Sequence, residues 1–199
     1  MTTEQEKFIT LKSLLAGVLI GIGACIYARC ENQYLGAFLF SFGLLGVLNF
    51  EALLFTGKIG YFNFKEANIK EEILKYTEIL CYNLIGILII GLLTFNFESV
   101  IFITKLNHSL LQTFISSIFC GVMMYLAVDL WKKNKNPLYV IMAIMIFILA
   151  GFDHCIANMY YFTINPVPVF KIRTLFFFII NIIGNSIGSL SIRYLINMK

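Results

Sequence analysis

Six apolar stretches, each about as long as a membrane-spanning helix, dominate this sequence. They cover residues 13–28, 34–55, 79–95, 110–130, 138–164 and 172–196. Because a helix needs about 20 residues to cross the hydrocarbon core of a bilayer, these stretches predict six transmembrane helices. Only 13% of the 199 residues are charged, whereas soluble domains average about a quarter. We therefore expect an all-α integral membrane protein that forms a single transmembrane domain over residues 1–199.

The basic residues of the connecting segments predict the orientation of the chain. Most lie in the N-terminal segment and in every second connection, at Lys7, Lys12, Lys58, Lys65, Lys70, Lys75, Lys132, Lys133, Lys135 and Lys199. The other connections hold Arg29, Lys105, Lys171 and Arg173. Because lysine and arginine concentrate in cytoplasmic loops, we expect both termini to lie in the cytoplasm. We expect the protein to be a multi-pass protein of the inner (plasma) membrane. Residues 1–12 are then a cytoplasmic lead, and the formal charge of +4 predicts no nucleic-acid partner.

The segment between the second and third apolar stretches has a mixed charge pattern. Acidic and basic residues alternate between residues 63 and 78. This pattern predicts an amphipathic helix on the cytoplasmic membrane surface, and a solvated linker is the alternative.

Cysteine and histidine usage predicts neither a metal site nor a disulfide framework. The five cysteines form no Cys-x-x-Cys pair, and the chain has only two histidines. Buried free cysteines usually act as small apolar packing residues. We therefore expect no metal and no cofactor.

Polar residues interrupt two of the apolar stretches. In the fifth stretch an acid, an imidazole, a thiol and an amide fall between Asp153 and Asn158, and in the second stretch Thr56 to Lys58 end the apolar run. Such groups are costly in hydrocarbon unless they face a cavity, a pore or each other. Interruptions at corresponding places of two half-chains predict a transport site between them. The halves, about residues 13–97 and 110–196, each contain three spans, so they form inverted repeats with the second and fifth helices broken.

Three motifs give the chain a resemblance to a known family. They are Phe55-Thr56-Gly57, Gly151-Phe-Asp-His-Cys-Ile-Ala-Asn-Met159 and Gly184-Asn185-x-x-Gly188. Together with the order of the six spans, they resemble the formate/nitrite transporter family over nearly the whole chain. The resemblance implies an aquaporin-like fold, a homopentamer with one pore in each subunit, and a small anionic substrate.

The resemblance also implies roles for individual residues. His154 matches the central pore histidine, and Thr56 matches the threonine that contacts it across the pore. Lys105 matches an outer-vestibule lysine that attracts anions. Asp153 and Asn158 belong to the same motif as the histidine, and Phe55 is a candidate pore residue together with Phe42 and Phe50.

The sequence departs from the family pattern at several positions. Gly121 replaces the asparagine of the fourth helix, which implies the loss of an amide near the histidine. Lys58 replaces the asparagine after the first interruption, and Asp153 replaces a glutamate. The glutamate expected three residues before Thr56 is Leu53.

A histidine in an apolar pore suits the passage of a weak acid. A neutral imidazole donates a hydrogen bond to an anion, and a charged one can give up a proton. The pore then binds the anion well enough to admit it and weakly enough to release it. We therefore expect a channel or a proton-linked transporter for small monovalent anions such as formate, nitrite or hydrosulfide, with membrane lipid around it.

Other interpretations of these residues stay open. A membrane enzyme could use His154, Cys155 and Asp153, but adjacent helical residues point about 100° apart. A non-conducting protein with a regulatory or structural role is the second alternative, favoured by Gly121. Thr56 could be only a helix cap, and Lys105 only a solvated loop charge.

Overall fold

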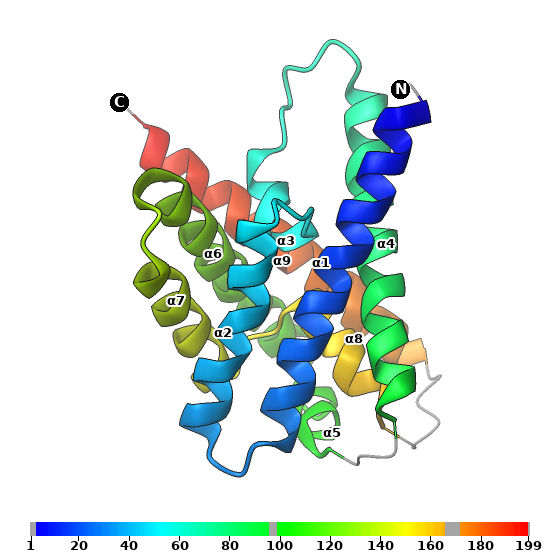
Figure 1. Ribbon diagram of the computed structural model, residues 1–199, viewed down its shortest axis with the longest axis vertical. Coiled ribbons are helices and arrows are strands. Elements are labelled where there is room, and N and C mark those ends of the chain that lie inside the picture. Colours follow the sequence, from blue (N-terminus) through cyan, green and yellow to red (C-terminus); the bar gives the residue numbers. More distant parts are fainter. Residues whose placement is uncertain (1–2, 96–98, 166–171, 199) are drawn as a thin grey trace.

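The computed structural model describes residues 3–95, 99–165 and 172–198, and all regular structure within these ranges is helical (Figure 1). The helices are α1 Thr3–Arg29, α2 Gln33–Asn49, α3 Phe55–Lys58, the 3-10 turn η1 Ile59–Tyr61, α4 Ile69–Leu93, α5 Ile101–Leu106, α6 Leu110–Asn134, α7 Pro137–Leu149, α8 Cys155–Thr163 and α9 Ile172–Asn197. Lys171 and Lys199, which contributed to the predicted orientation, lie outside the described residues.

Four of these helices are long and apolar enough to cross a bilayer. They are α1, α4, α6 and α9, while α2 and α7 are equally apolar but shorter. Large apolar side chains such as Phe42 and Leu93, which are 65% and 77% exposed, cover the outside of the bundle. A soluble monomer rarely exposes so much contiguous apolar surface, and the chain is an integral membrane protein.

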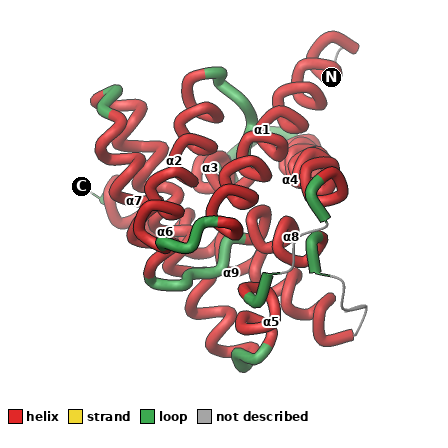
Figure 2. The backbone as a smooth tube through the Cα atoms, turned by 60° about the horizontal axis from the view of Figure 1, so that its bottom comes forward, coloured by secondary structure: helices red, strands yellow, loops and turns green. Residues whose placement is uncertain are grey.

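Two helix groups pack against each other through α2 and α7 and through the short helices α3 and α8. In one group α1 packs against α4 and α2, and in the other α6 packs against α9 and α7. The short helix α3 follows α2 but packs mainly against α6, and α8 follows α7 but packs against α4 and α1. Each short helix thus lies against the other half of the chain. Figure 2 shows α8 beside α5 at one end of the bundle, and the two helices are in contact.

Glycines allow the long helices to approach closely. A Cβ atom on Gly121 of α6 would overlap the backbone carbonyl oxygen of Asn185 in α9, and one on Gly17 of α1 would overlap that of Asn83 in α4. In a membrane, such small residues let helices associate through van der Waals contact between their backbones. Gly121 therefore lies at a close contact between α6 and α9, which gives a packing reason for the absence of a side chain at this position.

Replacing Gly121 by alanine is expected to destabilise the protein by about 1–3 kcal/mol. The added methyl group meets the backbone of Asn185, which cannot rotate away. Gly46→Ala is the matched control, because the new methyl group there would meet only side-chain atoms of Leu19, at 3.2 Å or more. Unfolding of both variants in mixed detergent micelles measures the difference. Equal stability of the two variants would contradict the packing role of Gly121.

The long helices extend beyond two of the predicted boundaries. The predicted lead at residues 3–12 is helical and continuous with α1. The separate surface helix predicted for residues 63–78 is wrong, because α4 runs without interruption from Ile69 to Leu93. Asn68 caps this helix by accepting a hydrogen bond from the Glu71 N–H, and no glycine or proline separates the charged first turns from the apolar part.

Candidate functional site

The chain leaves the helical conformation at equivalent points of the two halves. After α2, residues 50–54 are non-helical, and after α7 the same holds for residues 150–154. The Ala52 N–H donates to Val47 O at 2.8 Å, and the Phe152 N–H donates to Phe147 O at 2.9 Å. The residue before each donor has a positive φ, 52° for Glu51 and 71° for Gly151. The two interruptions therefore have the same backbone geometry.

A buried asparagine holds the first interruption in place. The side-chain oxygen of Asn83 in α4 accepts a hydrogen bond from the Phe55 N–H at 2.7 Å. Its amide nitrogen donates to Ser13 O at 2.8 Å and to Leu53 O at 2.7 Å. Helix ends and non-helical segments leave backbone groups without partners, and Asn83 supplies partners for two of these groups.

Asn185 in α9 makes the equivalent contacts at the second interruption. Its side-chain oxygen accepts from the Cys155 N–H at 2.9 Å, and its amide nitrogen donates to Ser117 O and Asp153 O, both at 2.8 Å. Sequence reasoning quoted Asn185 only as part of a motif and missed Asn83 altogether. The available signal was a second Asn-x-x-Gly spacing, at Asn83 in the third apolar stretch.

The interruptions bring His154 and Thr56 together from opposite halves. His154 Nε2 lies 2.9 Å from Thr56 Oγ1, which is the contact that the resemblance implies. His154 Nδ1 accepts a hydrogen bond from the Ala157 N–H at 3.1 Å, so the side chain also caps α8. Because Nδ1 accepts, a neutral imidazole carries its proton on Nε2 and donates it to Thr56. The Thr56 hydroxyl hydrogen can then point to another acceptor.

Lys105 is held in a buried ion pair beside His154. Its Nζ atom lies 2.8 Å from Asp153 Oδ1 and donates to Gly151 O at 3.0 Å and Phe152 O at 3.1 Å. Asn158 Nδ2 also donates to Asp153 Oδ1, at 3.0 Å. Asp153 is fully buried and Lys105 is 9% exposed. Lys105 is therefore not a solvated loop charge, and its charge is largely balanced by Asp153.

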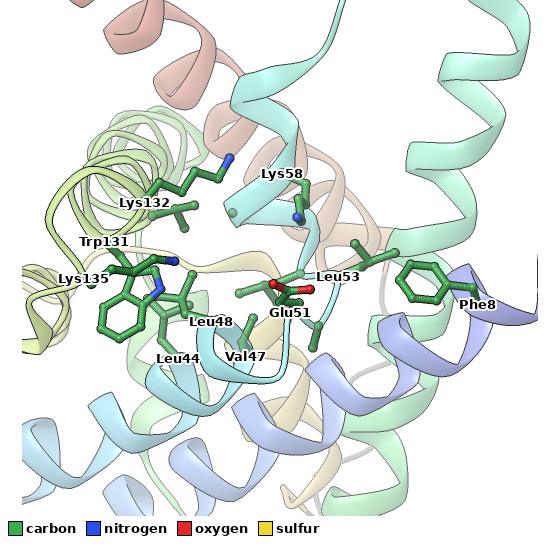
Figure 3. A pocket seen from close by; sticks show the side chains of 14 residues that line it. Phe8, Leu44, Val47, Leu48, Glu51, Leu53, Lys58, Trp131, Lys132 and Lys135 are labelled. Carbon is green, nitrogen blue, oxygen red and sulfur yellow. The ribbon is translucent and has the colours of Figure 1, made fainter. Parts of the chain in front are cut away.

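Two cavities lie toward opposite ends of the molecule. The cavity beside α5 has a volume of about 420 Å³ and is lined by residues that include Lys105, His108, His154, Asn158 and Tyr161. A second cavity of about 310 Å³ lies where α2, α3 and the end of α6 meet, and Leu54 and Gly57 are part of its lining (Figure 3). Neither set of lining residues includes Thr56 or Phe55. Leu54 and Gly57 on either side of Thr56 line one cavity and His154 lines the other, so the Thr56–His154 pair lies between the cavities.

Some aromatic candidates from the sequence lie elsewhere, and others were missed. Phe55 is buried at 5% exposure and lines neither cavity, while Phe42 and Phe50 are exposed on the outside of the subunit. Phe147 lines the cavity beside α5, with its ring centre 5.8 Å from that of His154. His108, which the sequence analysis did not single out, lines the same cavity. Residue types alone could not place either side chain there.

The described residues define an integral membrane protein of helices, with a buried histidine–threonine pair between two cavities. A sequence profile described as formate/nitrite transporter matches residues 3–198, so the chain belongs to this family. This is a family of transporters, not of enzymes, and the interpretation of His154, Cys155 and Asp153 as an active site has no support from it.

Relatives of known identity or structure agree with this assignment. The chain is 24% identical over 204 positions to a formate-nitrite transporter of Plasmodium ovale, which covers 81% of this chain, and the chain spans 65% of that relative's length. A solved structure described as a pentameric formate channel with formate bound matches with a TM-score of 0.73 and 20% identity, over 98% of this chain and 96% of its own. A structure described as an FNT family ion channel matches with a TM-score of 0.80 and 17% identity, over 96% and 90%. The solved structures show a shared fold.

Proposed function

We propose that this protein is a channel or proton-linked transporter for small monovalent anions, such as formate, nitrite or hydrosulfide, with one pore in each subunit. The observation that carries this proposal is the Thr56–His154 hydrogen bond of 2.9 Å in the wall between two cavities. An intramembrane histidine between two cavities is placed to meet a solute that passes from one to the other. The bound formate of the similar pentameric channel supports the substrate class.

The proposed architecture has six spans in two inverted repeats over the whole chain. In it α2 with α3, and α7 with α8, are the two halves of the broken second and fifth spans. The matching hydrogen bonds of Asn83 and Asn185 support the repeat. The distribution of lysines supports cytoplasmic termini in a cell or plasma membrane. The similar pentameric channel supports a homopentamer.

The proposed mechanism uses the neutral imidazole as a hydrogen-bond donor. An anion that enters the cavity beside α5 meets His154, which lines that cavity, while Thr56 does not. When the anion displaces Thr56 from the Nε2–H, both the imidazole and the Thr56 hydroxyl can donate to its oxygen atoms. In the proton-linked alternative, a protonated ring also transfers its proton to the anion. Asp153 lowers the attraction of this cavity for anions by balancing the Lys105 charge. The lysine–aspartate pair then has a structural role, as well as a modest electrostatic one.

Flux of formate, nitrite and hydrosulfide into liposomes tests the proposal. Wild-type protein is expected to pass at least one of these anions quickly, and His154→Ala is expected to change that flux by roughly 10²-fold, the size of a typical proton-transfer contribution. Thr56→Ser keeps the hydroxyl and is expected to retain flux, whereas Thr56→Val removes it and is expected to reduce flux. No flux above that of empty liposomes, from correctly assembled protein, would show that the chain does not conduct these anions.

A further inference from the structure

The cavity at the end of α6 contains positive charges that the proposed mechanism does not use. Three lysines line it, Lys58 from α3 and Lys132 and Lys135 from the end of α6, together with one carboxylate, that of Glu51. Most of its remaining lining is apolar. Two cations more than anions around a small, largely apolar space make an environment that favours a negatively charged solute.

Lys132 and its neighbour Lys133 already have partners. Lys133 Nζ lies 2.7 Å from Asp129 Oδ2, and Lys132 Nζ lies 3.3 Å from the centre of the Tyr61 ring. The Tyr61 hydroxyl donates to Asp129 Oδ1 at 3.1 Å. Burial and the Asp129 carboxylate raise the pKa of Tyr61 well above its usual value, so the hydroxyl remains a donor in this bond. These contacts hold two of the lysines at this end of α6 away from a solute.

Among the described residues, Lys58 and Lys135 have no hydrogen-bonded or ion-paired partner for their ammonium groups, although Lys135 lies over the Trp131 ring. Lys135 follows α6 in a left-handed conformation, with φ 53°, and its backbone N–H donates to Trp131 O at 2.8 Å. This turn places the Lys135 ammonium 5.6 Å from the centre of the Trp131 ring. Figure 3 shows Lys58 and Glu51 on one side of the cavity and Trp131 with Lys135 on the other.

The Trp131 indole provides a second, independent sign of a ligand. Its Nε1–H is buried and has no acceptor among the described residues, although the side chain lines the cavity. A buried donor without an acceptor is unfavourable, and this one lies on the same side of the cavity as the unpaired Lys135 ammonium (Figure 3). A small carboxylate has two oxygen atoms, so it can accept from the indole N–H and from an ammonium group at the same time.

We propose that this cavity is an anion-binding site at the inner mouth of the pore. Lys135 and the Trp131 indole N–H bind a small monovalent carboxylate such as formate, and Lys58 attracts it from the other side of the cavity (Figure 3). The proposal rests on the proposed function for the choice of formate and for the inner position. Glu51 lines the same cavity and competes for Lys58, so the site binds the anion loosely enough to release it. The site then raises the anion concentration beside the closed wall that His154 and Thr56 form.

Trp131 is the only tryptophan in the chain, so it reports on this cavity alone. Its fluorescence, excited at the red edge where the ten tyrosines do not absorb, is measured in detergent-solubilised protein at constant ionic strength. Iodide, an anionic quencher, is compared with acrylamide, a neutral one. We expect iodide to quench Trp131 more strongly than acrylamide does, and formate to reduce the iodide quenching in a saturable way.

Charge variants separate a specific site from general surface charge. Lys58→Gln and Lys135→Gln are each expected to lower the iodide quenching constant about two- to fivefold, as for the loss of one partly exposed ionic interaction, with acrylamide quenching unchanged. Lys58→Arg is expected to retain the wild-type response, and Glu51→Gln to strengthen it. Lys65→Gln, which removes an exposed lysine outside the cavity, is the control. Elution of each variant at the wild-type oligomeric size verifies that it folds.

Several outcomes would overturn the proposal. These are iodide quenching no stronger than that by acrylamide, absence of a formate effect in the wild-type protein, or an equal loss in Lys65→Gln and Lys58→Gln. His154→Ala is expected to change flux and to leave the Trp131 response intact. Formate-sensitive quenching of Trp131 without any anion flux would therefore support this site and contradict the proposed function. Anion flux without formate-sensitive quenching would support the proposed function and contradict this site.

Discussion

Lys105→Met is expected to destabilise the protein by about 3–5 kcal/mol, because it leaves a buried carboxylate without its counter-charge. Asp153 is fully buried, and its Oδ1 atom accepts from both Lys105 and Asn158. Its Oδ2 atom has no partner among the described residues, so nothing else there compensates the charge when Lys105 is lost. The carbonyl oxygens of Gly151 and Phe152 lose a donor as well. Equilibrium unfolding in mixed detergent micelles measures the loss.

Two further variants separate this effect from the loss of a long side chain. Adding Asp153→Asn to Lys105→Met removes the buried charge, so the double variant is expected to recover a large part of the stability. Lys133→Met breaks the ion pair with Asp129 at the surface, where Lys133 is 57% exposed, and is expected to have a much smaller effect. A Lys105→Met variant as stable as Lys133→Met would mean that the pair is not held in a low-dielectric environment.

The positions of the two interruptions were predictable from the sequence because polar groups in an apolar stretch carry a strong physical signal. Asp153, His154 and Asn158 marked the second interruption, and Thr56 with Lys58 marked the first. In the structure the non-helical segments are residues 50–54 and 150–154. Asp153 and His154 lie in the second segment, but Thr56 and Lys58 lie in α3, so the first interruption begins earlier than predicted. The resemblance added the Thr56–His154 contact, which no spacing in the sequence contains. The pore role of these residues remains a prediction.

Other features depend on tertiary packing and could not be predicted from the sequence. The sequence showed Gly121 only as the replacement of a polar residue, and not that its backbone packs against Asn185 of a helix more than 60 residues away. The resemblance implied that Lys105 is an outer-vestibule lysine that attracts anions. The sequence does not show that Asp153 lies 2.8 Å from its ammonium group and balances its charge. The start of α4 was misplaced because charged residues on the first turns of a long helix have the same pattern as a separate surface helix.

Asn185→Leu is expected to destabilise the protein by about 3 kcal/mol or more. Leucine has a similar volume, but it cannot replace the three hydrogen bonds that Asn185 makes to Cys155 N, Asp153 O and Ser117 O. A buried backbone group that loses its partner costs about 1–3 kcal/mol. Two of these groups flank His154, so the variant is also expected to reduce anion flux by displacing the imidazole from Thr56. Detergent unfolding and liposome flux measure the two effects.

Asn181 provides a matched control one turn earlier on the same helix. It is as fully buried as Asn185, but neither its side-chain oxygen nor its side-chain nitrogen has a hydrogen-bond partner among the described residues. Replacing an unsatisfied buried amide by an apolar group of similar shape is neutral or stabilising, so Asn181→Leu is expected to unfold no more easily than the wild type. The same substitution is therefore expected to destabilise the protein at Asn185 and not at Asn181, because only Asn185 hydrogen-bonds to a non-helical segment. Equal destabilisation by the two variants would mean that side-chain shape, and not hydrogen bonding, fixes the chain around His154.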